Sequence, residues 1–94
     1  MKRDNECAHI IVTGRVQGVY YRATAEETAR TLGLTGWVKN RGDGNVEILA
    51  EGDRAALENF INWCHQGPPL ARVKNVSADW QPATGQFSTF ETAY

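Results

Sequence analysis

The spacing of apolar residues switches from strand-like to helix-like twice along this chain, and that alternation limits the folds available to it. Residues 7–13 are rich in β-branched side chains and end before Gly14, and their even positions form one apolar face, as expected of a strand. The apolar residues on that face are Ala8, Ile10 and Val12. From Arg22 the apolar residues recur at spacings of four and three, which predicts a helix that ends before Gly33. Its inward residues are Ala25, Ala29 and Leu32.

The second part of the chain repeats this order of strand and helix. Residues 35–40 and 45–51 are typical of two strands, and the turn residues between them predict a β-hairpin. Asp53 is a good N-cap for a second helix, which ends at Gly67 and the two prolines after it. The apolar stripe of this helix consists of Ala56, Leu57, Phe60, Ile61 and Cys64.

Residues 73–80 predict a fourth strand, and residues 87–92 a short closing edge. The order β-α-β-β-α-β predicts an α+β fold, the ferredoxin-like sandwich, in which an antiparallel sheet carries two helices on one face. Both helices should then share one core with the inward strand residues. The other sheet face is expected to be solvated, and the residues predicted to point there are His9, Glu47 and Glu51.

Length and composition favour one soluble domain. The 94 residues, 41% of them hydrophobic and 22% charged, suit a single domain over residues 1–94 with a core from about residue 7 to residue 93. No apolar run approaches the length of a membrane span, and residues 1–6 lead into no signal-peptide core, so we expect a cytoplasmic protein. The net charge of -1 lacks the positive field of non-specific nucleic-acid binders, so any anion site must be local.

The two cysteines, Cys7 and Cys64, lie far apart, without CxxC spacing and without a nearby histidine pair. Neither cysteine therefore indicates a zinc or redox site. We expect two buried, reduced thiols, and a long-range disulfide between them is the alternative.

The connection from Gly14 to Arg22 is the first candidate site. Its two glycines let consecutive backbone N–H groups turn toward one concavity, and the start of the following helix adds unpaired donors and a positive dipole end. This geometry suits a phosphate. Arg22 in the first helical turn is unfavourable on dipole grounds unless an anion lies there too. The alternative is a solvated Arg22 paired with Glu26, four residues later.

Asn40, at the end of a predicted strand, is the second candidate. A carboxamide can orient a water molecule through one donor and one acceptor without titrating, which is useful beside an anionic substrate. The alternative is that Asn40 only helps to form the hairpin turn. Spacing alone leaves both interpretations open.

Two separate motifs in this chain resemble those of the acylphosphatase family. The first is Gly-Arg-Val-Gln-Gly-Val at residues 14–19, followed by two aromatic residues and Arg22. The second extends from Gly36-Trp37-Val38-Lys39-Asn40 through Asp43-Gly44 and Val46-Glu47 to Glu51-Gly52. Gly67-Pro68-Pro69, Ala71 and Val73 resemble a later segment of that family. Because the motifs occur in the expected order over about residues 10–90, a chance match is disfavoured.

The resemblance implies hydrolysis of an acyl phosphate to a carboxylate and inorganic phosphate. It places the family's catalytic arginine on Arg22 and its water-positioning asparagine on Asn40. The backbone amides that cradle the phosphate fall on Arg15, Val16, Gln17, Gly18, Val19, Tyr20 and Tyr21. Arg22 would hold two phosphate oxygens, the loop amides the third, and Asn40 the attacking water.

Neither motif contains a metal-ligand cluster or an obvious general base. The resemblance implies that none is needed, because the bound phosphate accepts the proton of the water. We therefore expect no metal and no cofactor, and no catalytic role for His9 or His65. The expected partners are a small acyl phosphate and inorganic phosphate, with no nucleic acid and no membrane, and we expect a monomer.

The chain departs from the family pattern at two positions. Tyr21 stands where the family most often has phenylalanine, so a hydroxyl must be accommodated. Glu51 stands where some bacterial relatives have the second cysteine of a disulfide.

Two other classes of function remain as alternatives. A non-catalytic anion-binding module would keep the loop without needing Asn40. An RNA-binding sheet would need exposed aromatic residues on its central strands, where this chain offers mainly His9 and acidic side chains.

Overall fold

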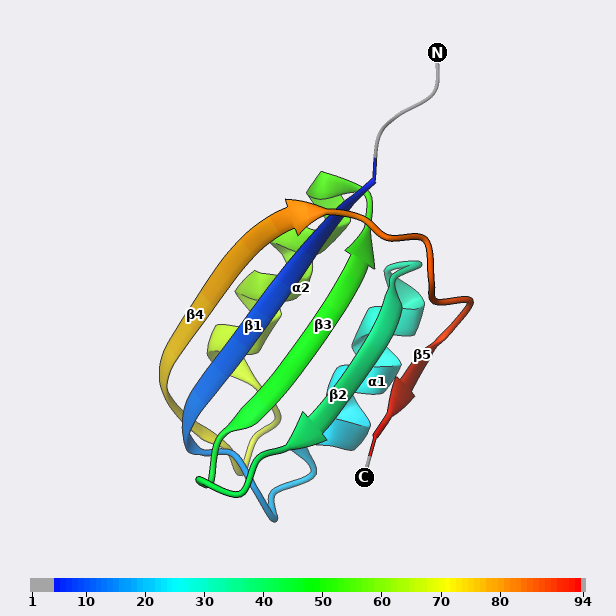
Figure 1. The fold of residues 1–94 in the computed structure, drawn as a ribbon. Coiled ribbons are helices and arrows are strands. Elements are labelled where there is room, and N and C mark those ends of the chain that lie inside the picture. The colour runs from blue at the N-terminus through cyan, green and yellow to red at the C-terminus, as the bar shows by residue number, and fades with distance from the viewer. Residues whose placement is uncertain (1–4, 94) are drawn as a thin grey trace.

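Five strands form one sheet in the order β4-β1-β3-β2-β5, and both helices cover the same face of it (Figure 1). The computed structural model describes residues 5–93. The elements are β1 (Glu6–Arg15), α1 (Tyr21–Thr31), β2 (Thr35–Asn40), β3 (Val46–Gly52), α2 (Arg54–Gln66), β4 (Arg72–Pro82) and β5 (Phe90–Thr92). The predicted ferredoxin-like order is confirmed. Neither of the two helices in this described part is long and apolar enough to cross a membrane.

The sheet is mixed, which corrects the prediction of an antiparallel sheet. β1 pairs antiparallel with β3 and β4, and β2 pairs antiparallel with β3, but β5 pairs parallel with β2. β4 ends at the end of the sheet where β2 begins, and residues 83–89 cross that end before β5 starts (Figure 1). The short edge strand therefore runs in the same direction as β2.

The predicted apolar faces meet in one core between the sheet and the helices. The largest fully buried side chains include Ile10, Ile48, Leu57, Phe60 and Phe90. The rings of Phe60 and Phe90 meet edge to face with centroids 5.9 Å apart, which joins β5 to α2. Burying a side chain of this size contributes about 1.5–3 kcal/mol. Leu32 and Ile61, also predicted to be inward, pack against this core but are only partly buried.

Helix α1 ends at a glycine, as predicted. Gly33 has a φ of 77°, and its N–H donates to the carbonyl of Arg30 at 3.0 Å. The N–H of Leu34 donates to the carbonyl of Ala29 at 2.9 Å. These two bonds form a Schellman cap, which satisfies carbonyls that the helix end leaves unpaired. The cap also turns the chain into β2, the strand that ends at Asn40.

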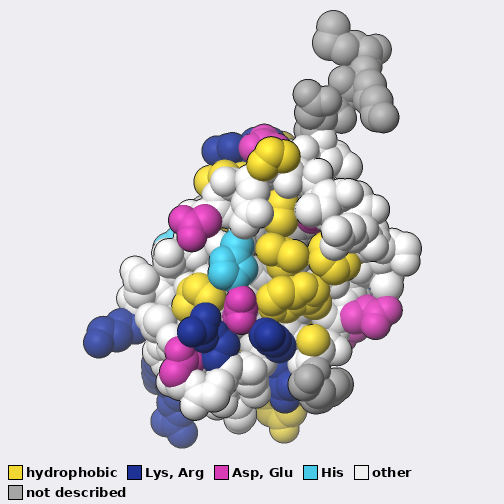
Figure 2. Space-filling view, viewed as in Figure 1, with side chains coloured by type: hydrophobic (Ala, Val, Ile, Leu, Met, Phe, Trp, Pro, Cys, Tyr) yellow, Lys and Arg dark blue, Asp and Glu magenta, His cyan; other side chains and the backbone are white. Residues whose placement is uncertain are grey.

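The open face of the sheet carries charged and hydrophobic side chains together. Figure 2 shows a histidine there between acidic and basic side chains, next to a hydrophobic group. The His9 ring Nε2 lies 2.6 Å from Oε2 of Glu47, and both side chains are half-buried. Lys39 and Arg41 each approach Oε1 of Glu47 to 3.9 Å. His9 and Glu47 thus point to the predicted face, where they are partly covered by their neighbours.

Glu51 is buried, with 4% of its surface exposed, so the prediction that it is solvated is wrong. The connection between β4 and β5 binds its carboxylate. Oε2 accepts hydrogen bonds from the N–H of Thr84 at 3.0 Å and from its hydroxyl at 2.8 Å, and Oε1 accepts one from the N–H of Gly85 at 3.0 Å. Burial opposes ionisation of Glu51, but these hydrogen bonds outweigh it and lower the pKa of the carboxyl group.

Cys7 and Cys64 are both buried and free. Burial, together with the neighbouring carboxylate of Glu51, raises the pKa of Cys7 to about 11. Burial raises the pKa of Cys64, on the inner side of α2, to about 12. Both thiols are therefore protonated at neutral pH, which makes them poor nucleophiles.

Candidate active site

The connection between β1 and α1 turns sharply through two residues in the left-handed region. Gly18 has a φ of 74°, and Tyr20 has a φ of 68°. Within residues 5–93, Tyr20 is the only residue other than glycine with a positive φ. Such a conformation costs on the order of 1 kcal/mol or more and is concentrated at functional sites. The carbonyl of Tyr20 is held by the N–H of Thr24 at 3.1 Å and by its hydroxyl at 2.9 Å, which fixes the strained turn.

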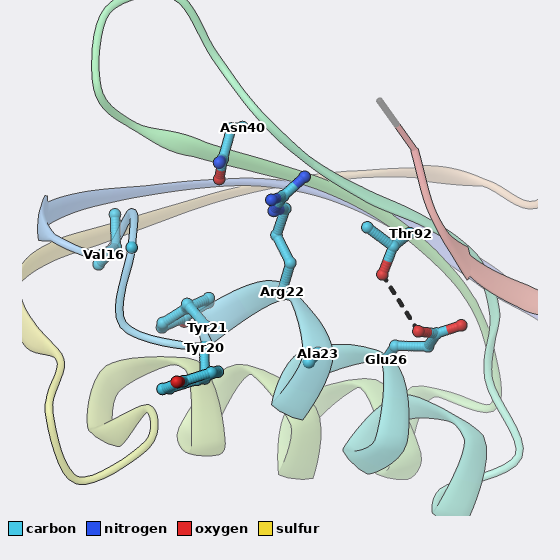
Figure 3. A pocket seen from close by; sticks show the side chains of 9 residues that line it. Val16, Tyr20, Tyr21, Arg22, Ala23, Glu26, Asn40 and Thr92 are labelled. Carbon is cyan, nitrogen blue, oxygen red and sulfur yellow. Dashed lines mark hydrogen bonds between the residues drawn. The ribbon is translucent and has the colours of Figure 1, made fainter.

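A cavity of about 390 Å³ lies between this connection, the start of α1 and the ends of β2 and β5 (Figure 3). Its lining residues are Val16, Gly18, Tyr20, Tyr21, Arg22, Ala23, Glu26, Asn40 and Thr92. Arg22 and Asn40, the two predicted catalytic residues, therefore line one cavity although they come from different elements. The guanidinium of Arg22 points toward the carboxamide of Asn40 (Figure 3).

Four of the seven loop residues predicted to cradle phosphate line the cavity, and three do not. Arg15 is exposed at the end of β1, and Val19 is buried in the core. Gln17 directs its side chain to the hairpin between β2 and β3, where it donates to the carbonyls of Arg41 and Asn45. The prediction for these three residues concerns their backbone N–H groups and does not require their side chains to line the cavity.

Glu26 and Thr92 also line the cavity, and the sequence did not identify them as site residues. The Thr92 hydroxyl donates to Oε1 of Glu26 at 3.1 Å, and Nη2 of Arg30 lies 2.9 Å from Oε2. Glu26 thus joins α1 to β5, whereas Arg22 points toward Asn40 (Figure 3). The four-residue spacing from Arg22 was a signal for Glu26. Thr92 had none, because β5 reaches the site only through long-range pairing with β2.

Asn40 is a partly buried residue whose side-chain oxygen is an unsatisfied acceptor. It ends β2, pairs with Val46 of β3, and its Oδ1 is buried without a hydrogen-bond partner in the described structure. A buried acceptor left in this way costs about 1–3 kcal/mol. The following turn is instead held by Asp43, whose Oδ1 accepts from the N–H of Asn45 at 3.0 Å. This arrangement favours a ligand-directed role for Asn40 over a role in the turn.

Tyr21 is buried, and its hydroxyl has a specific partner. The hydroxyl donates to the carbonyl of Cys64 at 2.8 Å, and burial raises the pKa of Tyr21 further above its usual value. In a continuing helix that carbonyl would accept from the N–H four residues later, but Pro68 stands there and has none. Gly67 allows the close approach, because a Cβ at this position would lie 2.9 Å from Cε2 of Tyr21. The hydroxyl therefore compensates for a missing donor at the end of α2.

Neither histidine lines the cavity. His9 lies on the open sheet face, and His65 is exposed in the last turn of α2. Among residues 5–93 there is no group of three or more His, Cys, Asp and Glu side chains that could hold a metal ion. The charged side chains that line the cavity are those of Arg22 and Glu26.

The fold is that of a small ferredoxin-like sandwich. The loop before its first helix lines one cavity together with Arg22 and Asn40. Within this class of sandwiches, the chain belongs to the acylphosphatase family, whose model matches residues 8–92. The chain is 52% identical over 87 residues to the acylphosphatase of Pelotomaculum thermopropionicum, covering 93% of this chain and 95% of that one. It is 54% identical over 86 residues to the acylphosphatase of Marinobacter nauticus, covering 92% and 94%.

The similarity extends to solved structures. The crystal structure of an acylphosphatase from Bacillus subtilis matches with a TM-score of 0.92 at 40% identity, covering 95% of this chain and 99% of that one. The structure of an acylphosphatase from Coxiella burnetii matches with a TM-score of 0.86 at 38% identity, covering 96% and 94%. The predicted family is confirmed, and with it the expectation of a hydrolase acting on acyl phosphates.

Proposed function

We propose that this protein hydrolyses acyl phosphates without a metal ion, with Arg22 and the loop amides holding the phosphoryl group and Asn40 orienting the attacking water. The observation that carries this assignment of roles is the buried, unpartnered Oδ1 of Asn40 in the cavity that Arg22 enters. An acceptor in that position can take a hydrogen bond from a bound water, which would remove the cost of leaving it unsatisfied.

The start of α1 supports an anion at the cavity. The N-cap residue is Tyr20, which provides no side-chain cap, and the first turn contains no acidic residue. The first N–H groups of a helix lack partners within it, and they lie at the positive end of its dipole. A phosphoryl group is a suitable acceptor for such donors, and the guanidinium of Arg22 matches two of its oxygens.

The reaction needs few groups from the protein. A water molecule attacks phosphorus, the bond between phosphorus and the acyl oxygen breaks, and that electron pair leaves on the carboxylate. The proton of the water passes to a phosphoryl oxygen, so no side chain has to act as a base. Positive charge from Arg22 and the loop donors stabilises the charge spread over the phosphoryl oxygens in a loose transition state. Asn40 contributes by fixing the water in line with the leaving group.

The proposed substrate is a small molecule, an acyl phosphate. We also propose that the enzyme is monomeric and cytoplasmic. The near-neutral net charge of -1 supports a local anion site rather than a surface for nucleic acid. Light scattering of the purified protein tests the monomer, because a mass near twice 10.4 kDa would contradict it.

Hydrolysis of benzoyl phosphate with a chelator present tests the proposed site. We expect metal-independent turnover in the wild type and a loss of about a thousandfold in Arg22→Ala with little effect on folding. Arg72→Ala, at an exposed arginine on β4, is the matched control and should turn over normally. Wild-type rates in Arg22→Ala, or activity restored only by added metal, would contradict the proposal. A folded wild type that binds phosphate without turnover would favour the non-catalytic binding module.

A further inference from the structure

The cavity brings together segments that the chain does not join directly, and the side chain of Gln17 links two of them. The phosphate loop belongs to the connection before α1, whereas Asn40 ends β2 at the hairpin. The carboxamide of Gln17 crosses between them. Its Nε2 donates to the carbonyl of Arg41 at 2.8 Å and to the carbonyl of Asn45 at 2.9 Å.

The two acceptors lie at the two ends of the hairpin turn. The N–H of Arg41 donates to the carbonyl of Asn45 at 2.8 Å, so this carbonyl accepts from both the turn and Gln17. Arg41 directly follows Asn40. A carboxamide nitrogen has two N–H groups, and both of those in Gln17 are used by the hairpin. The side chain therefore has no N–H left to donate to a bound phosphate.

We infer that Gln17 is a positioning residue that sets the separation between the phosphate loop and Asn40. This inference rests on the proposed function, in which the loop holds the phosphoryl group and Asn40 the water, so that this separation would set the distance from the phosphorus to the water. Two hydrogen bonds from one planar group fix both the position and the orientation of the turn relative to the loop. The side chain of Gln17 is directed at the hairpin and, unlike the backbone amides of the loop, is given no contact with the substrate or the water.

The reaction is sensitive to this separation. An in-line attack requires the water and the phosphorus to be held at contact distance, and a misplacement of about 1 Å can reduce the rate about a hundredfold. Loss of the link should leave the phosphate cradle and Arg22 in place, because both belong to the α1 side of the cavity. The effect should therefore fall on kcat rather than on the affinity for phosphate.

Two substitutions test the inference. Gln17→Glu keeps the shape of the side chain but replaces both N–H donors by an oxygen that faces two carbonyls. Gln17→Ala removes the link altogether. For benzoyl phosphate we expect kcat to fall by at least about tenfold in both variants, while KM and the inhibition constant of inorganic phosphate stay within about threefold. Gln81→Ala, at an exposed glutamine on β4, is the control and should match the wild type.

A double-mutant cycle separates positioning from a general structural role. If Gln17 acts through Asn40, adding Gln17→Ala to Asn40→Ala should not lower kcat further, so the two effects should not add. All rates are compared below the unfolding transition of each variant, as measured by circular dichroism. A lower Tm with unchanged kcat would overturn the inference, as would equal changes in kcat and phosphate affinity or additive effects in the cycle. None of these outcomes would contradict hydrolysis by the wild type, which serves as the reference.

Discussion

Two polar residues, Asn40 at the end of β2 and Glu51 one residue before the end of β3, differ in how hydrogen bonds satisfy their buried side-chain oxygens. The Glu51 carboxylate accepts three hydrogen bonds from the connection between β4 and β5, whereas the Asn40 Oδ1 accepts none. A satisfied buried group holds the fold together. An unsatisfied one costs stability and is retained where a ligand can complete it. The difference separates the structural end of the hairpin from its proposed catalytic end.

The largest expected effect comes from removing the unsatisfied group. Asn40→Ala should lower turnover of benzoyl phosphate by about a hundredfold or more, because the water loses its orientation. Phosphate should still inhibit competitively. The free energy of unfolding should stay equal or rise, since a buried acceptor without a partner disappears. Urea unfolding and steady-state kinetics check both parts, with Asn59→Ala on the exposed side of α2 as control. Loss of phosphate binding together with turnover would show that Asn40 holds the loop.

The opposite pattern is expected at Glu51. Glu51→Gln keeps the size of the side chain but directs an amide N–H₂ at backbone donors, so the protein should lose about 2 kcal/mol of unfolding free energy. Activity per folded molecule should be unchanged. Glu58→Gln, at an exposed position of α2, is the control. A loss of kcat in folded Glu51→Gln would contradict the proposed difference between the two ends of the hairpin, because both ends would then contribute to catalysis.

The pH dependence of the unfolding free energy provides a second test of Glu51→Gln. Folding lowers the pKa of Glu51 below its ordinary value of 4.5, so the native state favours the ionised carboxyl group. The stabilisation is fully present above that ordinary value and is lost as the pH falls through the lowered pKa. The difference in unfolding free energy between wild type and Glu51→Gln should therefore shrink from about pH 6 to about pH 3. A constant difference would contradict the assigned hydrogen bonds.

The smallest effect is expected at Tyr21, which lines the cavity and whose hydroxyl already donates a hydrogen bond to Cys64. Tyr21→Phe leaves the carbonyl of Cys64 without its donor and should cost about 1 kcal/mol of unfolding free energy. The phenyl ring still fills the core beside Trp63, so turnover should change little. Chemical denaturation and benzoyl phosphate kinetics measure both quantities. A large loss of turnover would show that this hydroxyl, like Gln17, positions the loop.

Local patterns explain why most of the fold could be predicted. Alternation placed Ile10 and Ile48 inward, and a glycine marked the end of α1. The errors came from one long-range feature, the crossing between β4 and β5. The alternation correctly put Glu51 on the open face, but the residues that cover it lie 33 and 34 positions later. No local pattern specifies that crossing or the parallel pairing of β5.

The candidate site was only partly accessible from local signals. Arg22 was a candidate because a cation at the start of a helix is unfavourable next to the helix dipole. Asn40 was a candidate because it ends a strand before a turn. Their assignment to catalysis depended on the resemblance to the family. The contact of Glu26 with Thr92 and the contacts of Gln17 required the tertiary structure, since each joins segments more than 20 residues apart.

The order of the strands also gives the sheet two unequal edges. β5 contributes three residues to one edge, whereas β4 exposes a strand of 11 residues at the other. A long edge strand presents backbone groups that can pair with another chain and start aggregation. Arg72, Lys74 and Asp79 place charges along β4, and a bulge at Gly14 interrupts its pairing with β1. Charges and bulges of this kind disfavour edge-to-edge pairing in other sheets, so the sequence of β4 that completes this sheet also carries the features that natural edge strands use against aggregation.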